Sequence, residues 1–136
     1  MSYLLDTDTC VAIIRKRPAR VLQRLKQQLP GTVGVSVITV GELSTGAAKS
    51  IQPERNAEAL VQFLLPLEIH TFDYGAAQAY GSLRVALEQQ GAPIGSMDVL
   101  IAAHAVSLDL TVVTHNTRHF AKVPGLRLED WFEPEG

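Results

Sequence analysis

The sequence has little cysteine, no long uncharged run and few residues before its first acid, and each absence excludes a class of protein. The one cysteine, Cys10, cannot form a disulfide within the chain, which fits a reducing, cytoplasmic location. The longest stretch without Lys, Arg, Asp or Glu, residues 27–41, contains Pro30 and is too short to span a bilayer. Asp6 lies too close to the start for a signal peptide. We therefore expect no membrane association.

Motifs for bound phosphate and for zinc are also missing. Neither G-x-G-x-x-G nor a Walker A sequence occurs. His115 and His119 have the spacing of a zinc-protease pair, but the glutamate of H-E-x-x-H is absent and no cysteine pair replaces it. The pattern gives zinc little support. We expect His104 to be a helix residue with a local hydrogen bond, and Cys10 to be a small core residue.

The composition is that of one folded domain spanning residues 1–136. Hydrophobic residues make up 46% of the chain and charged residues 19%, which allows a core and argues against disorder. The net charge is −2, but half of the twelve basic residues lie between Arg15 and Lys26. No acid occurs between Asp8 and Glu42. This asymmetry predicts either a local positive face or an ordinary solvated helix surface.

The hydrophobic pattern predicts alternating strands and helices. Strands are expected at residues 2–5, 32–37, 67–72 and 110–114, with a short last strand in LRLEDW that docks Trp131. Helices are expected at about 8–16, from Pro18 to about Leu29, around Glu42, between Pro53 and Pro66, from Asp73 to Gln90 and at 97–108. Such alternation predicts an α/β domain with a parallel sheet and helices on both faces.

Helix ends can be assigned from residue type. Thr7 or Asp8 is expected to cap the first helix, and Ser96 the apolar helix at 97–108. Similarly, Ser36 or Thr39 is expected to begin the helix carrying Glu42, and Asp73 to cap the helix that Gly91 terminates.

Polar side chains follow the apolar segments at four separate places. Asp6 comes after a strand, Glu42 and Asp98 lie early in helices, and Asn116 follows the strand at 110–114. Ligand sites in α/β domains form beyond the carboxyl ends of the strands, so these residues are expected to converge. Clustered carboxylates repel one another unless a cation is present, and oxygen ligands suit Mg²⁺ or Mn²⁺.

Each acid also has a plain alternative interpretation. Asp8 can be a helix cap, Glu42 can face solvent, and Asp98 can complement the dipole of its buried helix. The joint placement, rather than any single residue, carries the prediction.

The chain resembles the VapC-type toxins of the PIN-domain ribonuclease family, which belong to type II toxin–antitoxin systems. The segments that carry the resemblance cover about residues 2–133: LLDTDTCVAII, VSVITVGELSTGAAKS, ERN, PIGSMDVLIAAHA, VVTHNTRHF and LRLEDW. The resemblance implies a PIN-like three-layer α/β/α domain with a central parallel sheet of four to five strands. It also implies an endoribonuclease that uses Mg²⁺, or Mn²⁺ as a substitute, and hydrolyses RNA phosphodiesters with a metal-activated water.

The family's acidic quartet corresponds to Asp6, Glu42, Asp98 and Asn116, with the three acids as metal ligands. Asn116 departs from the many PIN domains that have an acid at this position. Where a common VapC subgroup reads TNNTREF, this chain has His115 for the first Asn and His119 for the Glu. Supporting roles are implied for Thr7 and Thr114, which match residues near the family's site; Asp8 can compensate for Asn116 if its side chain turns inward.

Partners follow from the same resemblance: a VapB-like antitoxin, an RNA substrate with tRNA as one candidate, and a second copy of the chain in a homodimer. We expect residues 8–29 to form part of the antitoxin groove, with apolar anchors that include Val11, Ile14, Val21, Leu25 and Leu29. Basic side chains at its rim, Arg15, Arg20 and Arg24, are candidates for contacting the antitoxin or RNA.

Two other functions compete with this interpretation. DTDTC resembles the start of haloacid-dehalogenase-like phosphatases, but these need a lysine and an acidic pair near the last strand, where this chain reads THNTRH. A PIN-like binding module with impaired catalysis is the other alternative, because position 116 is not acidic. Retention of Asp6, Glu42 and Asp98 argues against it.

Overall fold

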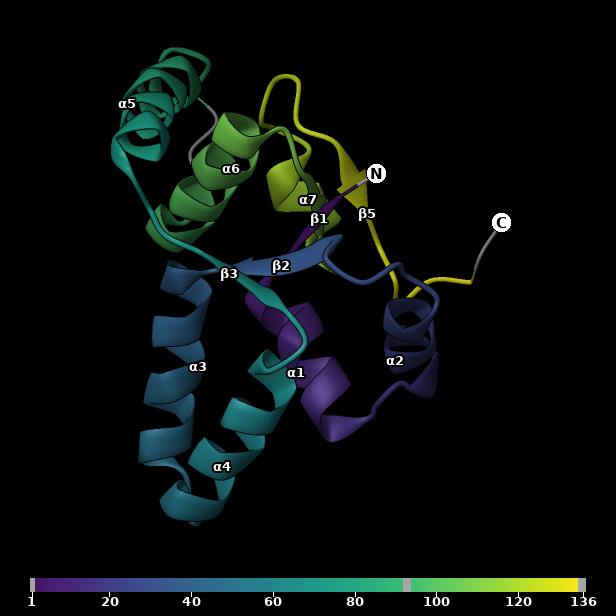
Figure 1. Cartoon of the computed structure of the whole chain (residues 1–136). Coiled ribbons are helices and arrows are strands. Elements are labelled where there is room, and N and C mark those ends of the chain that lie inside the picture. Colours follow the sequence, from purple (N-terminus) through teal and green to yellow (C-terminus); the bar gives the residue numbers. More distant parts are fainter. Residues whose placement is uncertain (1, 92–93, 135–136) are drawn as a thin grey trace.

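The computed structural model describes residues 2–91 and 94–134 and contains a five-stranded parallel sheet with the strand order β3-β2-β1-β4-β5 (Figure 1). The strands are β1 (Tyr3–Leu5), β2 (Val33–Ser36), β3 (Glu68–His70), β4 (Thr111–Val113) and β5 (Leu128–Glu129). The helices are α1 (Thr7–Arg15), α2 (Ala19–Lys26), α3 (Val37–Lys49), α4 (Pro53–Leu64), α5 (Tyr74–Gln89), α6 (Ser96–Leu108) and α7 (Thr117–Phe120). The expected three-layer α/β/α fold is confirmed.

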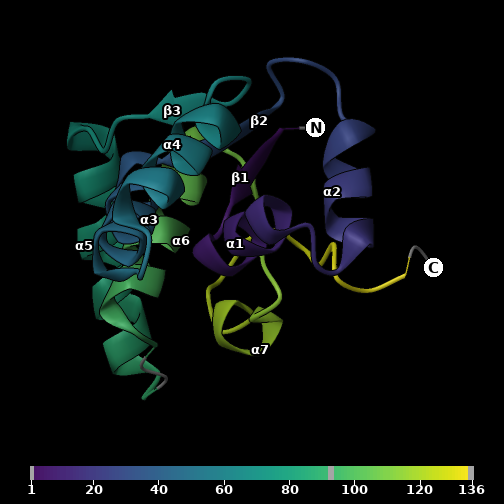
Figure 2. The same cartoon turned by 90° about the horizontal axis from the view of Figure 1, so that it is seen from below.

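Successive side chains of the central strands point alternately into two hydrophobic cores, one on each face of the sheet. Leu5 and Val113 are adjacent in register and belong to the core beneath α1, α2, α3 and α4. Leu4 and Val112 are also paired, but they face the opposite core, beneath α6 and α7. Successive side chains of a strand point to opposite faces, so these short apolar strands are buried on both. Figures 1 and 2 show α5 and α6 side by side at one edge of the molecule.

Most predicted helix ends are confirmed, and three are wrong. The Ser36 hydroxyl accepts from Ile38 N, Asp73 caps α5 through Ala76 N, and Gly91 has a positive φ just after α5. However, α1 begins one residue earlier than expected, with Asp6 rather than Thr7 or Asp8 at the N-cap position. Likewise Gly95, not Ser96, precedes α6, and α2 ends at Lys26.

The apolar stripe of α2 is shorter than predicted. Val21 is fully buried, whereas Leu29 lies beyond the helix and is 74% exposed. Trp131, in contrast, is fully buried, as expected, and packs edge-on against Tyr3. Within the described ranges, no helix has the length and hydropathy needed to cross a bilayer.

Candidate metal-dependent nuclease site

The site forms where β1 and β4 end side by side. Asp6 directly follows β1, and its backbone N–H donates to Val113 O of β4 at 2.9 Å. This pairing places Thr114 beside Asp6, and the Thr114 hydroxyl donates to Asp6 Oδ2 at 2.9 Å. The same hydroxyl oxygen accepts from Asn116 N at 2.9 Å. Both Asp6 and Thr114 are buried, so the two strand ends fix them rigidly.

Glu42 is joined to this edge by Thr7. The Thr7 hydroxyl donates to Glu42 Oε1 at 2.7 Å, across 35 residues of sequence. Glu42 is half-buried on α3, so its interpretation as a simple solvent-facing residue is wrong. Because Thr7 points at Glu42, its side chain does not cap α1.

Asp98 reaches the site from the first turn of α6. Its Oδ2 lies 3.7 Å from His119 Nδ1, and that nitrogen lies 3.0 Å from Asn116 Nδ2. His119 thus connects Asp98 to Asn116, which in turn is bonded to Thr114 beside Asp6. The sequence presented His119 as a substitution for an acid and as one of a spaced histidine pair; its position between Asp98 and Asn116 depends on tertiary contacts.

Asp8 lies at the other margin of the site. Its Oδ2 accepts the backbone N–H of His115 at 3.2 Å, and its Oδ1 accepts the Thr9 hydroxyl at 3.3 Å. The carboxylate therefore faces the loop after β4, and its interpretation as a helix cap is wrong.

The acids affect one another electrostatically. Burial, and next to it the charge of Asp8, raises the pKa of Asp6 from 3.8 to about 7. The charge of Asp98 also raises this pKa, whereas the hydrogen bond from Thr114 lowers it. Burial also raises the pKa of Asp98, with further increases from Glu42 and Asp8 that the His119 contact opposes. The four carboxylates therefore share one region, and their repulsion favours binding of a cation.

The basic residues of α1 and α2 have different environments. Arg20 donates to Phe132 O at 3.1 Å, and Arg24 donates to Glu129 Oε1 at 3.4 Å and lies over the Trp131 ring. These contacts hold the C-terminal segment against α2. Arg15 is exposed instead, at the rim of a groove beside the acids.

That groove runs between α1, α3 and α4 from Thr7 and Glu42 toward Leu60, with a volume of about 290 Å³. Val11 and Ile14, two of the predicted apolar anchors, line it. Leu25 and Leu29 line a separate depression near Pro66. Val21 is wrong as an anchor because it is fully buried in the core.

His104 does not belong to this site. It is fully buried, and its Nδ1 lies 2.8 Å from Ser36 Oγ, 68 residues away in sequence. The expectation of a local hydrogen bond is therefore wrong. Cys10 is fully buried in the core, as expected.

Comparison with known proteins places this architecture in a family. The PIN domain family matches residues 3–126. The tRNA(fMet)-specific endonuclease VapC of Salmonella typhimurium is 40% identical over 131 residues, which cover 96% of this chain and 98% of that protein. Ribonuclease VapC2 of Rickettsia felis is 41% identical over 132 residues, with the same shares.

Solved structures of VapBC proteins have the same fold as this chain. The DNA-bound VapBC of Salmonella typhimurium superposes with a TM-score of 0.91 at 40% identity, covering 96% of this chain and 98% of the matched chain. VapBC2 from Rickettsia felis bound to a promoter DNA fragment gives 0.88 at 39% identity, covering 96% and 99%. The chain therefore belongs to the PIN domain family, within its VapC-type toxin ribonucleases. These matches favour a nuclease over the phosphatase alternative.

Proposed function

We propose that the chain is a divalent-metal-dependent endoribonuclease whose ion is held by Asp6, Glu42 and Asp98. The observation that carries the proposal is the convergence at one edge of the sheet of three carboxylates, which come from the residue after β1, from α3 and from α6; Asp98 raises the pKa of Asp6, and Glu42 raises the pKa of Asp98. Their oxygen donors fit Mg²⁺ or Mn²⁺. Bound there, such an ion would acidify a water ligand and offset charge on the phosphate oxygens.

The protein groups around the acids have distinct tasks in this proposal. Thr114 and Thr7 each donate a hydroxyl hydrogen, to Asp6 and Glu42 respectively, which fixes one oxygen of each carboxylate and would orient the group for binding an ion. Asn116 offers an uncharged amide, so it contributes less to cation binding than an acid would. His119, beside Asp98, adds a nitrogen donor, which favours Mn²⁺ over Mg²⁺.

Cleavage of RNA by matched variants tests the proposal. Asp98→Asn is nearly isosteric and should abolish metal-dependent cleavage while the fold is retained, because Asp98 is a ligand in the proposal. Asp109→Asn changes an exposed acid outside the site and serves as the control. A soluble Asp98→Asn protein that cleaves as fast as the wild type would overturn the assignment. Wild-type protein that cleaves nothing in Mg²⁺ or Mn²⁺ would favour the impaired binding module instead.

For the substrate, we propose tRNA. The Salmonella relative bears a tRNA(fMet)-specific name, and the two chains align over almost their whole lengths. Purified tRNA(fMet), compared with an elongator tRNA mixture and an mRNA fragment, tests this choice directly. Equal cleavage of all three substrates would contradict it.

For the partner, we propose a VapB-like antitoxin seated in the groove between α1, α3 and α4. The solved neighbours are VapBC complexes, and the groove combines apolar walls with the Glu42 carboxylate at one end and the exposed Arg15 at its rim. An amphipathic segment with a basic residue reaching Glu42 would match both features.

We also propose that the chain forms a homodimer. An open apolar depression on α3 and α6, lined by Val37, Ile38, Met97 and Leu100 among others, is a candidate for the contact. Val37 and Met97 are 41% and 46% exposed, which is high for large apolar residues. Light scattering after size exclusion measures the mass, and a Met97→Lys variant should shift it to the monomer.

A further inference from the structure

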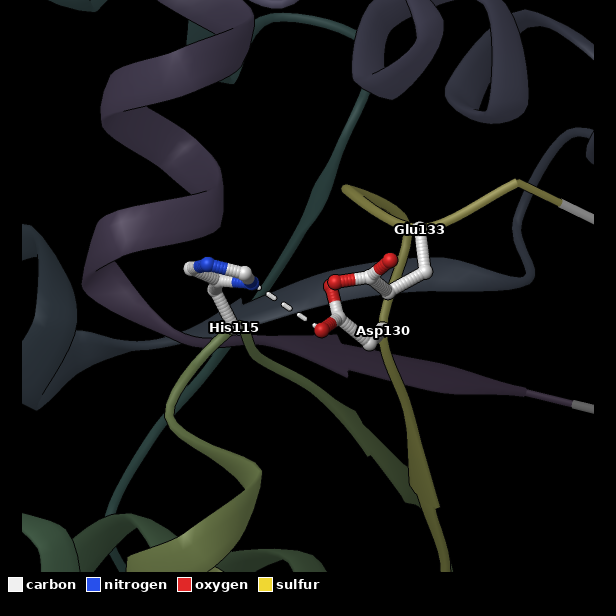
Figure 3. Close-up of side chains that lie close together, drawn as sticks. All are labelled: His115, Asp130 and Glu133. Atoms are coloured by element: carbon white, nitrogen blue, oxygen red, sulfur yellow. Dashed lines mark hydrogen bonds and ion pairs between the residues drawn. The ribbon is translucent and has the colours of Figure 1, made fainter.

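A second group of potential metal ligands lies at the end of β4, outside the acid cluster. Strands β4 and β5 are paired with Val113 opposite Glu129, so the residues that follow each strand come together. His115 and Asp130 therefore meet, with Nδ1 and Oδ2 3.0 Å apart. Figure 3 shows the ring of His115 facing this carboxylate, with the carboxylate of Glu133 beside it.

Glu133 completes a set of three donors. One potential ligand atom from each of His115, Asp130 and Glu133 lies within 4.8 Å of the other two. Across residues 2–91 and 94–134, no other set of three His, Cys, Asp or Glu residues meets this criterion. The proposed nuclease ligands do not meet it either. The donors come from two separate segments, the loop after β4 and the chain after β5.

Two of the three donors are held in place by the surrounding structure. The ring of His115 stacks on Phe132, with centroids 4.4 Å apart and planes inclined by 30°. The backbone N–H of His115 is fixed by Asp8. Asp130 Oδ1 accepts from Phe132 N at 2.9 Å, which leaves Oδ2 directed at the imidazole. Such supporting contacts orient ligands before a metal binds.

An ion pair is the simplest alternative explanation. A protonated His115 would balance one carboxylate, and this pair needs no metal. It does not include the second carboxylate: Glu133 forms no ion pair among the described residues, and the nearest guanidinium contact is that of Arg20 with the Phe132 carbonyl. A divalent ion balances both carboxylates and binds a neutral imidazole.

We propose that His115, Asp130 and Glu133 form a binding site for a divalent transition-metal ion, with Zn²⁺ as the best fit. A tetrahedral ion with bonds of about 2.1 Å holds its ligand atoms about 3.4 Å apart, close to the 3.0 Å between His115 Nδ1 and Asp130 Oδ2 and within the 4.8 Å that bounds the three donors. The imidazole nitrogen favours a transition metal over Mg²⁺. Three protein ligands leave a fourth position for water. The ion would fasten the C-terminal segment to the loop that carries Asn116.

Zinc titration in a variant that lacks two of the three proposed nuclease ligands, Asp6 and Asp98, separates this site from the acid cluster. In an Asp6→Asn, Asp98→Asn background, calorimetry should show one Zn²⁺ bound per chain. Adding Glu133→Gln, or His115→Asn, should weaken binding about tenfold or more, because each removes a direct ligand. Adding Glu54→Gln, an exposed acid on α4, should leave the affinity unchanged. Co²⁺ in place of Zn²⁺ should give visible absorption bands that the two ligand variants lose.

Two results would overturn the proposal. The background variant could bind no Zn²⁺, or Glu133→Gln could bind as tightly as Glu54→Gln; either outcome leaves His115 and Asp130 as an ion pair only. Glu133 is exposed, so its substitution should keep the fold even where His115→Asn does not, and a thermal melt without metal checks this. Since the readout is Zn²⁺ binding, the result is independent of RNA cleavage.

Discussion

Replacement of the Asp6 carboxylate tests the electrostatics of the site without any substrate. Asp6 is 7% exposed, and burial together with Asp8 raises its pKa from 3.8 to about 7. A group whose pKa is higher in the folded state favours folding below its unfolded pKa and loses that contribution as pH rises through its folded pKa. Without metal, the folded protein should therefore lose stability between about pH 4 and 7 on account of Asp6.

The size of the effect follows from the shift. A rise from 3.8 to about 7 corresponds to about 4 kcal/mol at pH 8 as an upper limit. Asp6→Asn keeps the shape and an oxygen that can accept the Thr114 hydroxyl. Its free energy of unfolding should exceed that of the wild type by up to about 4 kcal/mol at pH 8 and by little at pH 4.

Urea denaturation in EDTA at the two pH values measures this difference, with Asp109→Asn as the control. Saturating Mn²⁺ should then raise the free energy of unfolding of the wild type, by about 2.7 kcal/mol at 100 times its Kd. The same Mn²⁺ concentration should raise the free energy of unfolding of Asp6→Asn much less. A lower free energy of unfolding for Asp6→Asn than for the wild type, at pH 8 in EDTA, would show that the Asp6 charge does not destabilise the folded protein. Equal stabilisation of both proteins by Mn²⁺ would show that Asp6 is not a ligand.

Three further predictions concern other parts of the molecule. Asn116→Asp should tighten Mn²⁺ binding in calorimetric titrations, because it adds a charge beside the acids; unchanged affinity would place this residue outside the metal site. Gly46 lines the groove and has open space at its Cβ position, so Gly46→Leu should weaken antitoxin binding about tenfold in surface plasmon resonance, whereas Gly81→Leu on α5 should not. Burial lowers the pKa of His104, so its neutral form adds stability above pH 6.5 that is lost as pH falls below this value. His104→Leu should flatten that part of the pH profile in chemical denaturation, and an unchanged slope would refute this assignment.

Local sequence patterns predicted most of the secondary structure. The caps at Ser36 and Asp73 and the glycine after α5 were correct because they depend on the backbone of neighbouring residues. The apolar strands and their alternation with helices also predicted the parallel sheet. The predicted strand at residues 2–5 also placed Asp6 correctly, directly after the end of β1.

Two of the incorrect predictions, those on Thr7 and His104, share one physical cause, which is competition from a distant partner. Thr7 was a reasonable cap for α1, but Glu42 takes its hydroxyl. His104 bonds to Ser36 rather than to a residue of its own helix. No local pattern reports such pairs.

The sequence by itself determined the class of fold, the strand-end position of the acids and the family resemblance. Only the tertiary structure decided how closely the acids interact and which residues join them. The raised pKa of Asp6 depends on burial and on its distance to Asp8, and the meeting of His115 with Asp130 depends on the pairing of β4 with β5. Electrostatic energy varies with distance and with exclusion of water, and both are properties of the packed molecule rather than of any segment.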